Sequence, residues 1–159
     1  MDGLSATRAA EIIMYFNILV ALDGSESSQR ALEEALRIAA TPDTRVRVVH
    51  VTDAAALASY PVQYRTQVRE AARRVLDAAQ DRLRAAGIEC DSELEETRTP
   101  EDTVADTLQR CAEKMHADLV VMGTRGRGGL PRLVLGSVAE AFLRQSTCAV
   151  LLTRAAPHA

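Results

Sequence analysis

Residues 117–137, which read ADLVVMGTRGRGGLPRLVLGS, decide the fold and carry the clearest signal for a site. The stretch opens with a continuous apolar run over residues 119–122, which predicts a strand buried on both faces, and then becomes a loop rich in glycine and arginine. Apolar residues return at helical spacing from Val138, so the loop leads through Gly136 and Ser137 into a helix. Glycine permits close backbone approach, and a helix N-terminus offers free N–H groups and a positive dipole end. The stretch therefore predicts an anion-binding site.

Outward from this stretch, strand and helix patterns alternate along the chain. Apolar or alternating runs predict five strands, at residues 17–22, 46–51, 88–94, 119–122 and 148–152. Apolar residues at helical spacing follow each of the first four strands. This alternation predicts parallel strands joined by helices on both faces of the sheet, which is an α/β three-layer sandwich.

Capping and breaking residues indicate where the helices begin and end. Ser25 is expected to cap the first helix. The residues Thr99-Pro100-Glu101-Asp102 have the form of a capping box and predict the start of the third helix. Residues 53–63 carry little signal, so we expect a connector there, followed by a long amphipathic helix that spans residues 68–83 and ends at Gly87.

Composition limits the classes of function. A chain of 159 residues is long enough for one domain with a sizeable core, and no apolar run approaches the ~20 residues of a membrane span. The N-terminus lacks the apolar core of a signal peptide, so we expect a cytoplasmic protein with no membrane partner. A net charge of −3 without a clustered basic face argues against binding to nucleic acid. The single lysine, Lys114, is not part of a Gly-Lys-Ser/Thr sequence, which excludes a Walker P-loop.

The three cysteines give no sign of a disulfide framework or a metal site. Cys90, Cys111 and Cys148 form no CxxC motif and no Cys/His pairing, so they are expected to be small, buried, apolar side chains.

The spacing Gly123-x2-Gly126-x9-Gly136-Ser137 is similar to the nucleotide-binding signature G-x2-G-x9-G-[ST] of the ATP-binding branch of the universal stress proteins. Residues 16–26 and 46–51 resemble the first and second strands of that family. The resemblance covers residues 16–154, which we expect to form one domain. It leaves residues 1–15 as a flexible N-terminal extension and residues 155–159 as a short tail.

The resemblance implies a Rossmann-like sheet of the nucleotide-alpha-hydrolase type with strand order 3-2-1-4-5. In that order the carboxyl ends of strands one and four lie side by side, and the crevice between them is the binding position. It also implies that this crevice holds ATP, with Mg²⁺ bound through the phosphates, Asp23 as a possible metal ligand, and adenine recognised by backbone groups beside Val51. The residues expected to bind the nucleotide are Ala21, Leu22, Asp23, Val51, Met122, Gly123, Arg125, Gly126, Arg127, Gly136, Ser137 and Val138.

Several of these residues also have a purely structural interpretation. Asp23 precedes Gly24 in a common turn dipeptide. Ser137 and Glu140 have capping-box spacing, which would engage the Ser137 hydroxyl with the helix backbone. Arg125 and Arg127 would suit a phosphate, although loop arginines also keep an exposed segment soluble.

No constellation of catalytic side chains is visible in the sequence. Asp23 is the only acid placed clearly at the crevice, so we expect no enzyme and at most slow, incidental ATP hydrolysis. A Rossmann dehydrogenase is excluded because Pro131 stands where the last glycine of G-x-G-x-x-G belongs. The sequence predicts an ATP-binding stress-response regulator. A dimerisation module with a vestigial site and a sensor of AMP or cyclic AMP remain as alternatives.

The fifth strand predicts the oligomeric state. In the order 3-2-1-4-5 residues 148–152 lie at the sheet edge, yet they are as apolar as a central strand. An exposed edge of this kind pairs readily with a second chain. We therefore expect a homodimer formed through this strand, as in the family that the chain resembles.

Overall fold

The computed structural model describes residues 15–39, 41–125 and 135–156. Its elements, in chain order, are β1 (Asn17–Ala21), α1 (Glu26–Ile38), β2 (Arg45–Thr52), α2 (Ala54–Leu57), α3 (Val62–Ala85), β3 (Glu89–Glu96), α4 (Val104–Lys114), β4 (Leu119–Gly123), α5 (Ser137–Gln145) and β5 (Ala149–Thr153). The expected extension falls on residues 1–15, of which 1–14 lie outside the described part, as do residues 157–159 of the expected tail.

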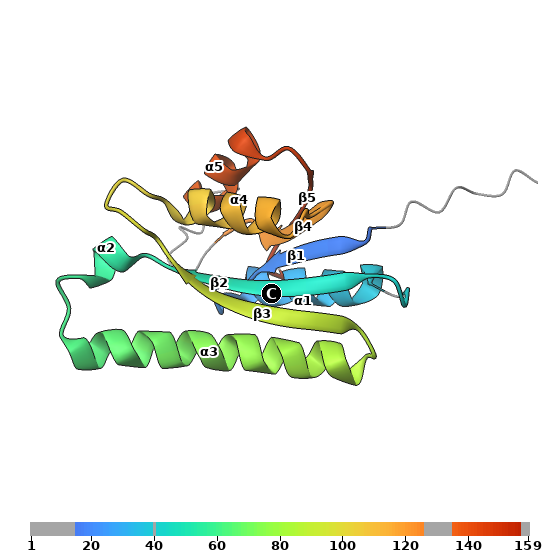
Figure 1. The fold of residues 1–159 in the computed structure, drawn as a ribbon, viewed down its shortest axis with the longest axis horizontal. Helices are drawn as coiled ribbons and strands as arrows, with labels where there is room; N and C mark the ends of the chain where they lie inside the picture. The colour runs from blue at the N-terminus through green and yellow to red at the C-terminus, as the bar shows by residue number, and fades with distance from the viewer. Residues whose placement is uncertain (1–14, 40, 126–134, 157–159) are drawn as a thin grey trace, which may run out of the picture.

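The five strands form one parallel sheet in the order β3-β2-β1-β4-β5, as the family resemblance implied. Helices α1 and α3 cover one face, and α4 and α5 cover the other (Figure 1). The result is the expected three-layer sandwich.

Strand β1 illustrates why the sheet is buried on both sides. Ile18 and Val20 pack with α1 and α3, whereas Leu19 packs with α4 and α5, because successive side chains of a strand point to opposite faces. All three side chains are fully buried. A continuous apolar run is therefore required in the centre of the sheet.

Two predicted boundaries are wrong. Helix α4 does not begin at Thr99; its N-cap is Thr103, which forms a reciprocal capping box with Asp106. Residues 99–102 form a turn instead, in which the Asp102 N–H donates to the Thr99 carbonyl oxygen at 3.1 Å. Both sites satisfy the same sequence pattern, and α4 begins where its apolar residues, from Val104 onward, can face the sheet.

The expected connector over residues 53–63 is also more ordered than predicted. Asp53 caps the short helix α2, accepting a hydrogen bond from the Ala56 N–H at 3.0 Å, and α3 begins directly after Pro61. The first turns of α3 carry large exposed side chains, Val62 and Tyr64, and therefore lack the apolar stripe on which the prediction relied.

The two edge strands differ in character. On β3, acidic side chains pair with basic ones on β2, as in the Arg47–Asp91 ion pair. Strand β5 is apolar and mostly half-buried, and it pairs with β4 along one side. Within the described residues, no helix is both long and apolar enough to cross a membrane.

Candidate functional site

A cavity of about 450 Å³ opens at the carboxyl ends of β1 and β4. Its described lining consists of Ala21, Leu22, Asp23, Ser25, Ser28, Val49, Val51, Val104, Leu108, Met122, Gly123, Thr124, Arg125, Gly136, Ser137, Val138 and Ala139. Ten of the residues expected from the sequence are therefore brought together here. The other two, Gly126 and Arg127, lie outside the described residues.

The topology explains the position of this cavity. Strands β1 and β4 are neighbours, with Val20 paired to Val121, while the helices that follow them, α1 and α5, leave toward opposite faces. A crevice therefore opens where the strand order reverses, which is the usual ligand position in open α/β sheets.

One wall of the cavity is apolar. Val49 and Val51 are two residues apart on β2 and therefore point to the same face of the sheet. Val104 and Leu108 lie one turn apart on α4. Met122 of β4 completes this wall. Such a lining suits the face of a flat aromatic ring, whose polar edge atoms would need other partners.

The N-terminus of α5 also lines the cavity. Gly136 is the N-cap residue, at φ −74° and ψ 161°, and no side chain caps the helix. The expected Ser137 capping box is wrong, because Ser137 is already the first helical residue, and Glu140 pairs with Arg144 instead. Within the described residues, the N–H groups of the first turn therefore depend on solvent or a ligand, and this end of the helix attracts negative charge.

Asp23 follows β1 on the rim of the same cavity. Its Oδ1 accepts a hydrogen bond from the Ser25 N–H at 2.9 Å, and Gly24 between them has a φ of +81°. The turn interpretation is thus confirmed as a structural role. Asp23 also lines the cavity, so the same residue can stabilise the turn and contact a ligand.

Hydrogen bonds join the two ends of the glycine loop. The Gly136 N–H donates to the Thr124 carbonyl oxygen at 2.5 Å, and the Thr124 N–H donates to the Thr153 carbonyl oxygen at 2.8 Å. The Ser27 hydroxyl of α1 donates to the Arg125 carbonyl oxygen. Thr124, Arg125 and Gly136 are thereby held to one another and to α1 and β5.

Sequence reasoning missed seven lining residues: Ser25, Ser28, Val49, Val104, Leu108, Thr124 and Ala139. Two of these residues could have been predicted from the sequence. Val49 is two residues before Val51 on the same strand, so it had to share its face, and Ser28 lies in the first turn of α1, close after Asp23. The position of α4 over β2 had no local signal, so Val104 and Leu108 could not be placed in advance.

A second cavity, of about 620 Å³, lies on the other side of Asp23. It is bounded by His50 at the end of β2 and by α3 residues that include Gln67 and Arg74. Asp23 thus stands between two cavities on opposite faces of the sheet.

Fold and site together define a Rossmann-like α/β domain with a ligand cavity at its topological switch point. The sequence model of the Universal stress protein family matches residues 14–154, and the chain belongs to that family. It is 30% identical over 146 residues to a protein of Staphylococcus aureus (strain USA300) named as a universal stress protein, covering 90% of this chain and 86% of the relative.

Two solved structures are informative. The chain is 38% identical to a protein of the universal stress protein family from Burkholderia pseudomallei, with a TM-score of 0.68, covering 87% of this chain and 96% of that one. It is 27% identical to a universal stress protein in complex with cAMP, with a TM-score of 0.64, covering 91% of this chain and 100% of that one. An adenine nucleotide is therefore a ligand of at least one protein with this fold.

Proposed function

We propose that the cavity binds ATP together with Mg²⁺ and that the protein acts as a stress-response regulator. The observation that carries this proposal is the α5 N-terminus, which has no side-chain cap and lines the same cavity as a group of apolar side chains. An anion and a flat apolar group would be bound by the two ends of one site, and a nucleotide contains both.

Each part of the nucleotide has matching residues. The N–H groups of the first turn of α5, from Ser137 onward, would bind phosphate, with Arg125 and Arg127 as further donors. Adenine would lie against Val51 and Met122. The phosphates would supply most of the ligands to Mg²⁺, which prefers oxygen donors, and the Asp23 carboxylate is suitably placed to add one.

The lining supports a regulatory rather than a catalytic role. Asp23 and Arg125 are the charged residues among those that the structure describes around the cavity, which offers one carboxylate and no paired acid and base. We infer that hydrolysis is slow and incidental. Bound nucleotide would instead alter the conformation of residues 124–135 and thereby the surface that partner proteins meet.

The apolar edge of β5 supports a homodimer. Strand β5 bonds to β4 along one side and presents its other side as a free edge among the described residues. Because the Thr153 carbonyl oxygen accepts from the Thr124 N–H at 2.8 Å, a dimer formed there would lie one hydrogen bond away from the base of the glycine loop.

A sensor of AMP or cyclic AMP is the second candidate, and the relative in complex with cAMP favours it. One helix N-terminus suffices for a single phosphate, so the described part of the cavity suits either nucleotide. A dimerisation module with a vestigial site would bind neither.

Thermal melting of protein stripped of bound ligand separates these three candidates. ATP with Mg²⁺ at a hundredfold excess over its dissociation constant should stabilise the fold by about 2.7 kcal/mol. That corresponds to roughly 5–10 °C in Tm for a domain of this size. A shift in Tm with AMP or cyclic AMP alone would contradict ATP binding and support a sensor of a monophosphate. No shift in Tm with any nucleotide would support the dimerisation module with a vestigial site.

A further inference from the structure

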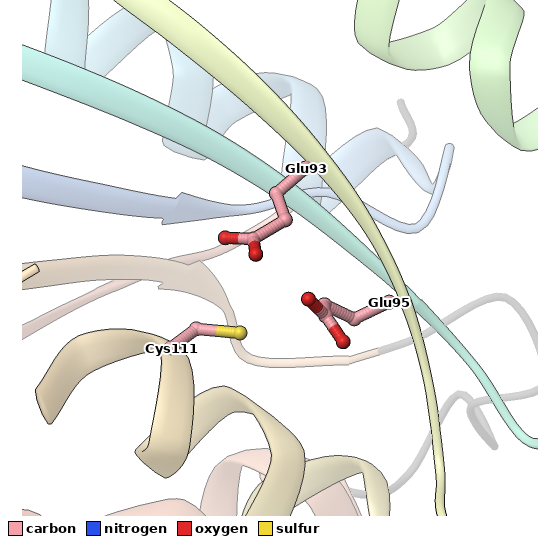
Figure 2. Close-up of side chains that lie close together, drawn as sticks. All are labelled: Glu93, Glu95 and Cys111. Atoms are coloured by element: carbon pink, nitrogen blue, oxygen red, sulfur yellow. The ribbon is translucent and has the colours of Figure 1, made fainter. Parts of the chain in front are cut away.

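Three metal-ligating side chains converge outside the nucleotide cavity. Glu93 and Glu95 lie two residues apart on β3 and therefore share a face, and Cys111 of α4 points into the space between them (Figure 2). One carboxylate oxygen of each glutamate and the Cys111 Sγ all lie within 4.8 Å of one another. The sequence separates Cys111 from these glutamates by a turn and two turns of helix, so only the packing of α4 on β3 brings the three together.

The thiol at this cluster is enclosed. Cys111 is only 4% exposed, and its Sγ makes no hydrogen bond to any residue that the structure describes. Burial and the two nearby carboxylates raise its pKa to about 11. A polar side chain is thus buried and aimed at two acids without a partner.

One carboxylate oxygen of Glu93 also lacks a hydrogen bond among the described residues. Glu93 Oε1 accepts from the Lys114 Nζ at 2.8 Å, whereas the buried Oε2 has no hydrogen-bond partner among the described residues. The Arg47 Nη1 lies 3.5 Å from Oε2, but the same guanidinium already donates to both oxygens of Asp91. The buried Oε2 thus has an ion pair with Arg47 but no hydrogen bond, which leaves it able to accept a further ligand.

The two carboxylates of the cluster lie close together. Their oxygens are within 4.8 Å of each other, and the cationic side chains of Lys114 and Arg47 contact Glu93. Two charged carboxylates at this separation repel each other, and a divalent cation bound between them would remove that repulsion.

We propose that Glu93, Glu95 and Cys111 form a zinc site that joins β3 to α4. Two carboxylates and one thiolate combine hard and soft donors, a set that suits Zn²⁺ and does not suit Mg²⁺ or Ca²⁺, which prefer oxygen alone. Three protein ligands leave the fourth tetrahedral position to water. The site is distinct from the nucleotide cavity and does not depend on the proposed function.

Binding would need only small rearrangements. The Lys114 side chain is 66% exposed, so its ion pair with Glu93 can open to solvent at little cost. The thiol proton, and any proton shared by the glutamates, would be released to water as the metal enters. Zinc affinity is therefore expected to rise with pH.

Cobalt provides the direct test, because Co²⁺ bound to a thiolate gives a sulfur-to-metal charge-transfer band that Co²⁺ bound only to oxygen lacks. Titration of the reduced full-length chain with Co²⁺ should give this band at one equivalent, and added Zn²⁺ should remove it. Cys111→Ser should abolish the band. Cys90→Ser changes the half-buried cysteine at the other end of β3 and should leave the band intact.

A second variant keeps the test decisive if Cys111→Ser fails to fold. Glu95→Gln removes one ligand from the half-buried part of β3 and should weaken Co²⁺ binding at least tenfold, whereas Glu89→Gln, on the exposed end of the same strand, should not. The proposal is overturned if the wild-type protein gives no thiolate band, if the band persists without Cys111, or if Glu95→Gln binds Co²⁺ as tightly as Glu89→Gln.

Discussion

Ser27 of α1 and Gly123 at the end of β4 lie so close that no side chain fits between them. A Cβ added to Gly123 would lie 2.8 Å from the Ser27 Cβ and 2.9 Å from the Ser27 carbonyl carbon. The same serine donates a hydrogen bond to the Arg125 carbonyl oxygen, two residues past this glycine. Gly123 is therefore needed to pack α1 against the strand that leads into the glycine loop.

Replacement of Gly123 by alanine should accordingly destabilise the fold by about 1–3 kcal/mol, the usual cost of overpacking. Chemical denaturation measures this loss. In a double-mutant cycle with Ser27→Gly the two losses should not add, because removing the Ser27 side chain relieves part of the clash. Additive losses would mean that the close approach does not limit the packing.

Gly136→Asp is expected to separate helix stability from nucleotide binding. The N-cap conformation at φ −74° and ψ 161° accepts aspartate. The free energy of unfolding without ligand should therefore stay the same or rise by a few tenths of a kcal/mol. The added carboxylate would occupy the N–H groups and repel phosphate, which should abolish the Tm shift caused by nucleotide. Gly136→Asn adds the same shape without the charge and should retain more of the shift; equal loss in both variants would point to crowding rather than charge.

Asp23→Ala should weaken nucleotide binding and also cost some stability. The lost hydrogen bond to the Ser25 N–H is worth about 0.5–1.5 kcal/mol. Asp53→Ala is the matched control, because Asp53 likewise follows a strand and accepts a backbone N–H, from Ala56 at 3.0 Å, but does not line the cavity. Calorimetric titration with nucleotide should show a loss for Asp23→Ala alone, and an equal loss in both variants would assign Asp23 a structural role only.

The Asp102–Arg110 pair should make the stability depend on pH under acidic conditions. Asp102 accepts from the Arg110 Nη1 at 2.8 Å and Nη2 at 2.7 Å and from the Arg98 N–H at 2.7 Å, and these donors hold its pKa well below the ordinary value of 3.8. Because the folded state favours the charged form, this stabilisation is present above pH 3.8 and is lost as the pH falls further. Asp102→Asn should therefore melt below the wild type at pH 7, and thermal melts should show the gap closing below about pH 4. A gap independent of pH would contradict the assignment.

Ala149→Lys tests the dimer interface proposed for β5. Ala149 is exposed at the start of this edge strand, and lysine on an edge discourages pairing between strands. Light scattering should find a dimer for the wild type and a larger monomer fraction for the variant. Ala78→Lys, at an exposed position of α3, should remain dimeric, and a wild-type monomer at micromolar concentration would refute the interface.

The fold was predictable because its signals are local. A short apolar run such as residues 119–122, followed by a glycine-rich loop, indicates a buried strand, and Gly87, at a φ of +74°, ends α3 as its sequence position indicated. The wrong start of α4 arose because two neighbouring stretches met the same local rule. Thr99 and Thr103 both satisfy the capping pattern, and only the fit of α4 against the sheet selects Thr103.

The sequence by itself determined the alternation of strands and helices, the helix N-terminus at Gly136 and the position of Asp23 after the first strand, because each depends on residues within one or two turns of chain. Only the tertiary structure determined which residues of other helices and strands lie next to these positions. Val104 and Leu108 reach the cavity, and Cys111 reaches Glu93, because α4 packs across β2 and β3. Such contacts follow from how whole faces pack, which no local pattern encodes.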